Sequence, residues 1–197
     1  MIRGMQRLFR RAILHSILLG CSLSAQAAQF TIGELMATLA NRHDGVATFT
    51  ETKYLAILDL PVESSGELLF APPARLEKRT LKPKVETLAL DGEVLTVVSQ
   101  TQRHVLQLKD YPEVAGIVES LRAILTGDRQ ALERLYRLKL EGSPQRWALE
   151  LKPLDAAVGW SIARIRVEGT GDEVRSVEIQ QTDGDRSVMR VQKGVSP

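Results

Sequence analysis

The sequence predicts an α+β protein built on one large antiparallel sheet that curls, with helices over one of its faces. The expected elements come in the order helix, about six strands, two helices and about five strands. This order lacks the regular alternation of strand and helix that builds a parallel, doubly wound sheet. A sheet of about ten strands normally curls or closes. Each helix group has an apolar face that could cover the concave side, so we expect a cavity between helices and sheet.

The chain begins with a segment typical of an export signal. Arginines at 3, 7, 10 and 11 precede an apolar run over 12–20, and Ala25-Gln26-Ala27 follows it. The apolar run is much shorter than the roughly 20 residues that a membrane-spanning helix needs. We therefore expect residues 1–27 to be a signal peptide, residues 28–197 to form a single domain, and the mature protein to work outside the cytoplasm.

Cys21, the single cysteine of the chain, allows a second processing route. Leu18-Leu19-Gly20-Cys21 resembles the lipobox of bacterial lipoproteins, in which the cysteine is lipidated and becomes N-terminal. Cleavage after Ala27 or Ala28 is favoured, because folded sequence starts almost at once and leaves no tether. On that route the mature chain has no cysteine, and hence no disulfide and no thiol chemistry.

Removal of the leader changes the charge balance. The leader contains four of the 26 basic residues and no acidic residue, so 22 basic residues remain against 24 acidic ones, a formal charge of −2. This charge gives no reason to expect nucleic acid or anionic lipid headgroups as partners. About 170 mature residues suit one domain with one core.

The first mature helix is predicted to begin after Thr31. Thr31 and Glu34 have the spacing of a capping box, and Phe30 and Leu35 stand where a hydrophobic staple would close. A single apolar stripe then follows at helical spacing: Ile32, Leu35, Met36, Leu39 and Ala40. We expect this stripe to pack against a sheet or to form part of a lid.

From Val46 the apolar period changes to two, which predicts strands. In the first strand Phe49 shares a face with Glu51 and Lys53, whereas threonines occupy the opposite face. Further strands are expected at 62–70, 74–81, 86–90, 94–98 and 101–108, with Pro72-Pro73, Lys82-Pro83 and an Asp91-Gly92 hairpin turn between them.

The middle of the chain is predicted to be helical. Pro112 lies near the start and Gly127 just past the end of one helix, and Asp128 caps a shorter helix through Leu135. Beyond it Trp147, Leu149 and Leu151 alternate with polar residues. Three more strands are expected at 160–168, 174–182 and 186–193, with turns at Gly171-Asp172 and Gly184-Asp185.

Short motifs in a particular order give the chain a family resemblance. They are Phe49-Thr50-Glu51, Ser65-Gly66-Glu67-Leu68 with Phe70 and Pro73, Thr87, Asp91-Gly92, Leu125-Thr126-Gly127-Asp128, Trp147-Ala148-Leu149-Glu150-Leu151-Lys152-Pro153 and Asp183-Gly184-Asp185. Together they resemble the periplasmic lipoprotein carriers of the Lol system, and more closely the LolA-related proteins encoded beside lipid and aryl-polyene biosynthesis enzymes. Their order and spacing, which cover most of the mature chain, carry the resemblance.

Two departures from the family pattern bear on the cargo. Val94-Leu95-Thr96-Val97-Val98 stands where the carrier proper usually has a tryptophan-containing strand, and the sequence shows no extra C-terminal hairpin before Pro197. A lipoprotein and another acylated or polyene lipid are therefore comparable cargo candidates.

The resemblance implies an unclosed β-barrel with a helical lid over an apolar cavity, in a periplasmic protein that carries acylated lipid or lipoprotein between the inner and outer membranes. It also implies an inner-membrane transporter and an outer-membrane acceptor as partners. We expect a monomer with no cofactor, no metal and no nucleic acid partner. The predicted cavity-lining residues are Phe49, Leu68, Phe70, Leu76, Leu88, Leu90 and Leu149 on strands and Leu35, Leu39, Ile117, Leu121 and Leu125 on helices. The same stripes are also typical of an ordinary packed core.

Charged residues near these positions have two interpretations each. Glu51 and Lys53 are predicted to lie at the cavity rim and contact the lid backbone, although a solvated pair on a strand is the commoner arrangement. Lys78 and Arg79, close to Lys82 and Lys84, could meet an acidic partner or a lipid phosphate. We favour the second interpretation, in which Lys78 and Arg79 lie on an edge strand and deter aggregation.

We do not expect an enzyme. The mature chain has only His43 and His104, no HExxH motif, no nucleophile elbow and no Gly-rich phosphate loop. Ser64-Ser65 and Asp183 with Asp185 are common turn sequences rather than a nucleophile or a cation site. The main alternative to a soluble carrier is an acceptor anchored to the outer membrane through Cys21. A non-carrier envelope protein or a hydrolase has less support.

Overall fold

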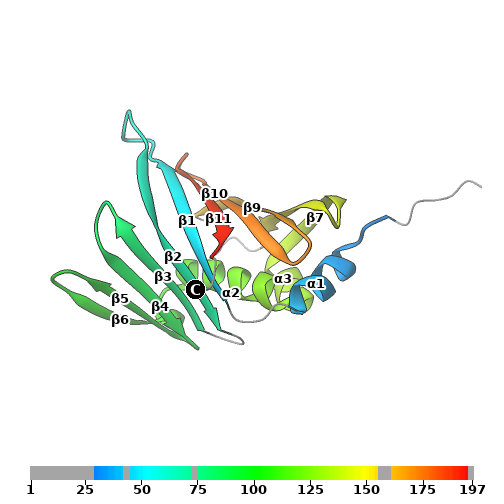
Figure 1. Cartoon of the computed structure of the whole chain (residues 1–197), viewed down its shortest axis with the longest axis horizontal. Helices are drawn as coiled ribbons and strands as arrows, with labels where there is room; N and C mark the ends of the chain where they lie inside the picture. Colours follow the sequence, from blue (N-terminus) through cyan, green and yellow to red (C-terminus); the bar gives the residue numbers. More distant parts are fainter. Residues whose placement is uncertain (1–28, 42–44, 72–74, 155–160, 195–197) are drawn as a thin grey trace, which may run out of the picture.

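The computed structural model describes residues 29–41, 45–71, 75–154 and 161–194 of the chain. The predicted leader, with Cys21, and His43 and Pro72-Pro73 lie outside these residues. The described part contains three α-helices, α1 (Ile32–Ala40), α2 (Pro112–Thr126) and α3 (Arg129–Leu135), and a short 3₁₀ turn at Leu108–Asp110. Figure 1 shows the helices together on one side of a long sheet.

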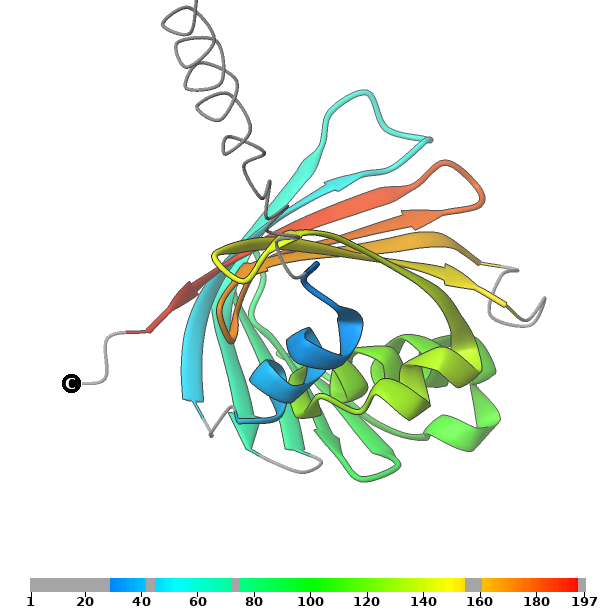
Figure 2. The ribbon, with the colours of Figure 1, turned by 90° about the vertical axis from the view of Figure 1, so that its right-hand side faces the viewer.

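Eleven strands of the described residues form one antiparallel sheet, in the order β6-β5-β4-β3-β2-β1-β11-β10-β9-β8-β7. Their bounds are β1 Gly45–Tyr54, β2 Val62–Ala71, β3 Arg75–Lys82, β4 Glu86–Asp91, β5 Val94–Ser99, β6 Arg103–Gln107, β7 Tyr136–Ser143, β8 Arg146–Pro153, β9 Ile162–Thr170, β10 Glu173–Gln181 and β11 Arg186–Lys193. β6 and β7 stand at opposite ends of this order, so the sheet is not closed. The α+β class with an unclosed, curled sheet and three helices is thereby confirmed. Figure 2 shows the sheet curving around the helices.

Local signals account for the helix ends. The Thr31 hydroxyl oxygen accepts from the Glu34 backbone N–H, and the Glu34 carboxylate accepts from the Thr31 backbone N–H at 2.8 Å, which completes the predicted capping box. Asp128 caps α3 by accepting from the Ala131 N–H at 2.9 Å. Each cap satisfies backbone donors that the first turn of a helix leaves without partners.

Gly127 ends α2 and lets α1 approach it closely. Its φ of 69° lies in the left-handed region, which glycine adopts without steric cost. A Cβ atom at this position would stand 2.2 Å from the Met36 carbonyl oxygen on α1. The glycine therefore serves both the helix end and the packing of α1 against the α2–α3 corner.

Three sequence expectations need correction. The strand expected at 101–108 is shorter, Arg103–Gln107, because Leu108 already starts the 3₁₀ turn. The strand β7 had no predicted range of its own; it follows α3 without a loop, so no turn residue announces it. β3 is not an edge strand, since β2 and β4 pair with its two sides, so the edge-strand interpretation of Lys78 and Arg79 is wrong.

Candidate functional site

The strand residues predicted to line a cavity all share the face of the sheet that the helices cover. Directly opposed residues share a face, and the register pairs Phe49 with Gly66, Phe70 with Leu76, and Leu76 with Leu90. The register through β11, β10 and β9 likewise places Leu149 of β8 on the same face as Phe49. Leu149 packs in one buried cluster with Leu35 of α1, which places the helices on this concave face.

Two hydrophobic clusters occupy the two sides of the concave face. The first joins all three helices to β7–β10 and includes Leu35, Leu39 and Leu149, each completely buried, with Ile117 and Leu125 packed against it. The second contains Leu90, Leu95 and Leu108, with Leu76, Leu88, Leu106 and the first turns of α2 packed against it. The predicted lining residues in these clusters are therefore in contact with packed neighbours in this structure.

The centre of the concave face belongs to neither cluster. The inward apolar side chains of β1, β2 and β11 include Phe49, Leu68, Phe70, Met189 and Val191, and none of these five is a member of the two clusters. Leu68 and Met189 are only half-buried, as is Leu121 of α2, which also stands outside both clusters. These three apolar side chains are the best candidates for contact with a hydrophobic ligand. The sequence analysis did not single out Met189, which shares a strand face with Val191 because one residue, Arg190, separates them.

A group of polar side chains lies on the same concave face of the sheet, around the buried carboxylate of Glu51. Lys78 Nζ lies 2.5 Å from Glu51 Oε2, and the Ser187 hydroxyl donates to Oε1 at 2.6 Å. Ser64 donates at 3.4 Å, and Lys53 Nζ stands 3.9 Å away. Burial raises the pKa of Glu51, but the bonds from Lys78 and Ser187 and the charges of Lys78 and Lys53 outweigh it and lower the pKa overall. The carboxylate is therefore ionised at neutral pH.

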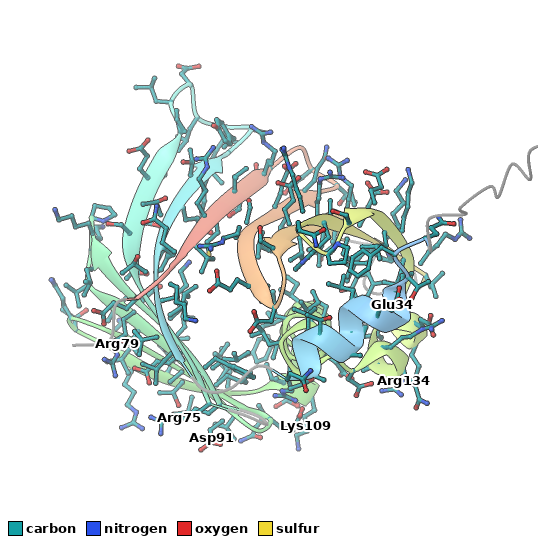
Figure 3. All side chains as sticks on the ribbon, turned by 45° about the vertical axis from the view of Figure 1, so that its right-hand side comes forward. Glu34, Arg75, Arg79, Asp91, Lys109 and Arg134 are labelled. Carbon is teal, nitrogen blue, oxygen red and sulfur yellow. The ribbon has the colours of Figure 1, made fainter. Side chains whose placement is uncertain are left out.

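This polar group ties four neighbouring strands together. Glu51 and Lys53 come from β1, Lys78 from β3, Ser64 from β2 and Ser187 from β11. The Lys78 ammonium stands 4.8 Å from the centre of the Phe49 ring, a cation–π contact. The partners of Glu51 among the described residues all lie on strands, so the predicted bond from Glu51 to the helix backbone is not among them. In Figure 3 Arg75 and Arg79 of β3 point away from the helices, to the outer side of the sheet.

Arg122 holds α2 to the hairpin turn between β4 and β5. Its Nη2 donates to the Gly92 carbonyl oxygen at 2.5 Å, and its Nη1 lies 3.4 Å from Glu93 Oε1. No sequence pattern indicates this role, because Gly92 and Glu93 lie about thirty residues before Arg122 in the chain. The contact fixes the position of the helix that bridges the two clusters.

We predict that Arg122→Ala loosens α2. Loss of the charge-assisted bonds should lower the local opening free energy by about 1–2 kcal/mol, so backbone amides over 115–126 should exchange with deuterium faster. Hydrogen exchange read by mass spectrometry checks this. Arg134→Ala is the control, since Arg134 is exposed and meets Glu119 only at 3.9 Å. Equal exchange in both variants would contradict the role of Arg122.

Other features of the described residues offer little chemistry. No three His, Cys, Asp or Glu side chains in the described residues gather as metal ligands. Asp183 accepts from the Asp185 backbone N–H at 3.0 Å and so closes the β10–β11 turn. Of the helices in the described part, none has both the length and the apolar character to span a membrane.

Two depressions lie on the outer face of the sheet, over β7–β11. Their volumes are about 320 and 430 Å³, and Arg166, Glu168 and Arg175 line both of them. Neither is lined by a residue from the predicted apolar set. Their mixed charges continue a network of surface ion pairs, which contributes little to stability.

Comparison with known proteins places the chain in a family. The family described as "outer membrane lipoprotein carrier protein LolA-like" matches residues 24–193. No curated protein matches the chain. Among solved structures, the chain is similar to a LolA superfamily protein from Nitrosomonas europaea (11% identity, 85% of this chain, 96% of that chain, TM-score 0.43). It is also similar to the MucA/MucB complex from Pseudomonas aeruginosa (13% identity, 84% of this chain, 58% of that chain, TM-score 0.44). A third similar structure is LprF from Mycobacterium bovis (10% identity, 84% of this chain, 93% of that chain, TM-score 0.37).

The family match covers most of the chain and includes every helix and strand described above. The predicted resemblance to the LolA-like carrier family is thereby confirmed. The members of this family are binding and carrier proteins of the periplasm or cell envelope rather than enzymes. This chain belongs to the LolA-like family of outer membrane lipoprotein carrier proteins.

Proposed function

We propose that this protein carries an acylated lipid or lipoprotein cargo through the periplasm and shelters acyl chains on the concave face of its sheet. The observation that carries the proposal is the apolar centre of that face, where Leu68 and Met189 are half-buried and outside both packed clusters. Each methylene of an acyl chain gains about 0.8 kcal/mol on leaving water, with little directional chemistry. Aliphatic side chains are therefore sufficient to hold such a cargo.

Cargo would enter by movement of α2 relative to the sheet. α2 contributes Val114 and Val118 to one cluster and Ile124 to the other, with Leu121 between them in sequence and in neither. A shift of this helix would uncover more of the face around Leu68 without breaking a strand pair. Transfer to and from the cargo's membrane partners, an inner-membrane transporter and an outer-membrane acceptor, would supply the driving force.

The polar side chains around Glu51 lie beside the apolar centre of the concave face. The Lys78 side chain is 21% exposed, and the strand register places it on the concave face, opposite Leu68. In this proposal acyl chains occupy the apolar centre, and the polar part of a cargo faces Lys78 and the hydroxyls of Ser64 and Ser187. This arrangement suits lipids that combine an aliphatic chain with a polar or anionic group.

The binding of a fluorescent polyene fatty acid tests the proposal. Leu68→Gln places an amide on the concave floor and should weaken probe binding by about tenfold or more. Leu69→Gln is the matched control, because Leu69 is also half-buried but points to the outer face of the same strand. Absence of probe binding by the unsubstituted protein, or equal affinities of the two variants, would count against a concave lipid site.

An anchored acceptor is the second candidate, and the Leu18-Leu19-Gly20-Cys21 sequence favours it. The protein expressed with its own leader in a Gram-negative host would decide between the two by its intact mass. A mature chain that starts near Ala28 without added mass supports the soluble carrier. Acyl mass on a chain that starts at Cys21, lost in Cys21→Ser, supports the acceptor.

A further inference from the structure

The loop between β1 and β2 displays a dense group of exposed aliphatic side chains. Within residues 55–61, Ile57 is 90% exposed, Leu60 is 78% exposed and Leu58 is exposed as well. We name residues 55–61 the hairpin tip. Figures 1 and 2 both show the β1–β2 hairpin reaching beyond the neighbouring hairpins at that end of the sheet. The aliphatic groups therefore stand at a projecting point, where no neighbouring element of the described chain covers them.

Hydrogen bonds and a cation–π contact order the base of the hairpin tip. The Ala56 N–H donates to Asp185 Oδ1 in the β10–β11 turn at 2.7 Å, and the Leu58 N–H donates to the Leu55 carbonyl at 2.9 Å. The Arg186 guanidinium stacks 4.4 Å from the centre of the Tyr54 ring at the base of the tip. Because this base is already ordered, burial of the aliphatic side chains in a partner would need little further ordering.

The chemistry of the tip and its base matches a lipid bilayer. Aliphatic side chains occupy the end, while an exposed tyrosine, Tyr54, and two cations, Lys53 and Arg186, lie just beneath them. Aromatic residues and long cations are the groups that settle at headgroup level when an apolar segment enters the hydrocarbon. Asp59, Glu63 and Asp185 outnumber these two cations, so the region has no excess positive charge to attract anionic lipid.

We propose that the hairpin tip inserts Ile57, Leu58 and Leu60 into the surface of a bilayer, and that this contact does not depend on anionic lipid. A few aliphatic side chains give reversible binding only, which suits a protein that must leave the membrane again. The concave face of the sheet begins next to the tip. Along β1, away from the tip, Lys53 and then Glu51 are the first residues on that face. Insertion of the tip would bring that end of the proposed cargo site to the membrane.

This inference goes beyond the proposed function and is tested without cargo. Protein purified from the periplasm in a Cys21→Ser background is mixed with phosphatidylcholine vesicles, and bound protein is measured by co-sedimentation. The double variant Ile57→Ser/Leu60→Ser should lower the partition coefficient by about tenfold or more. Val46→Ser/Val105→Ser is the matched control, because those valines are 47% and 55% exposed but lie away from the tip, Val46 at the opposite end of β1 and Val105 in β6. The N-terminal segment is common to all variants, so it cannot create a difference between them.

The outcomes separate a lipid from a protein partner. The proposal holds when the unsubstituted protein and the valine control bind alike, the tip variant binds weakly, and added phosphatidylglycerol changes binding by less than about twofold. It is overturned when the unsubstituted protein fails to bind pure lipid, when both double variants bind equally, or when binding requires membranes that contain protein. Thermal unfolding of each variant shows that it is folded. Because fatty acid binding is measured separately, loss of vesicle binding alone would leave the carrier proposal standing.

Discussion

Trp147→Ala is expected to lower the free energy of unfolding by about 3–5 kcal/mol, the usual range for deletion of a fully buried tryptophan. Trp147 is 1% exposed in the cluster that joins the helices to β7–β10. Its ring occupies the space over Gly169 on β9, where a Cβ atom would stand 2.2 Å from the ring, and its Nε1–H donates to the Gly171 carbonyl at 2.9 Å. The alanine variant would lose the apolar contacts and this bond, and would leave a cavity. Urea unfolding followed by circular dichroism measures the change.

Two controls separate these contributions. Trp147→Phe retains much of the apolar contact but loses the Nε1–H donor, so we expect a smaller loss of about 1–2 kcal/mol. Lys152→Ala on the same strand removes an exposed side chain and should change the free energy of unfolding by less than about 0.5 kcal/mol. A loss below about 1 kcal/mol in Trp147→Ala would show that this cluster does not hold the helices to the sheet.

Removal of the Glu51 carboxylate is expected to have the second largest effect. Glu51→Ala leaves the Lys78 ammonium and the Ser187 hydroxyl without their acceptor on the concave floor. Breaking a fully buried ion pair in this way costs about 3–5 kcal/mol, and the remaining exposure of Lys78 reduces the expected loss to about 2–3 kcal/mol. Glu67→Ala is the control, because Glu67 is well exposed and its ion pair with Arg79 measures 4.0 Å.

The double variant Glu51→Leu/Lys78→Met removes both charges at once. Replacement of a buried ion pair by apolar residues of similar size is often close to neutral, so this variant should unfold with nearly the wild-type free energy. A double variant as unstable as Glu51→Ala would show that the loss comes from packing around Phe49 rather than from an unpaired Lys78. Fatty acid binding by the same proteins tests whether Lys78 faces a polar part of the cargo.

The Glu51 carboxylate should also give stability a defined dependence on pH. Its pKa in the folded protein lies below the ordinary value of 4.5, so the ionised form stabilises the fold. This contribution is complete above about pH 4.5 and is lost as the pH falls through the lowered pKa. Glu51→Gln has no such proton to gain, so its free energy of unfolding should fall less steeply below pH 4.5. Parallel curves for the two proteins would contradict the lowered pKa.

Most of the fold could be predicted because its signals are local. The capping box at Thr31, the glycine that ends α2 and the turn at Gly184 each act within a few residues of themselves. The alternation around Phe49 and Glu51 likewise places both residues on one face whatever the neighbours are. The range of β7 was not predicted, because β7 starts directly after α3 with no turn residue between them.

The candidate site could be predicted only in part. The sequence indicated which residues face inward, but a packed core and an open lipid site use the same apolar stripes. The structure places Leu35, Leu39 and Leu149 in a packed cluster and leaves Leu68, Leu121 and Met189 half-buried outside it. This distinction depends on how helices and sheet fit together, which no local pattern contains.

The sequence by itself determined most of the element types, the faces of the clearly alternating strands and the family, because helix caps, turn residues and side-chain periods are properties of short segments. Only the tertiary structure decided which strands are neighbours. The pairing of β1 with β11 brings Ser187 to within 2.6 Å of Glu51, 136 residues earlier in the chain. The pairing of β3 with both β2 and β4 likewise places Lys78 inside the sheet, where it contacts the buried carboxylate of Glu51. Such contacts form between distant segments when the sheet curls and the helices pack against it, so their energies are set by the assembled fold.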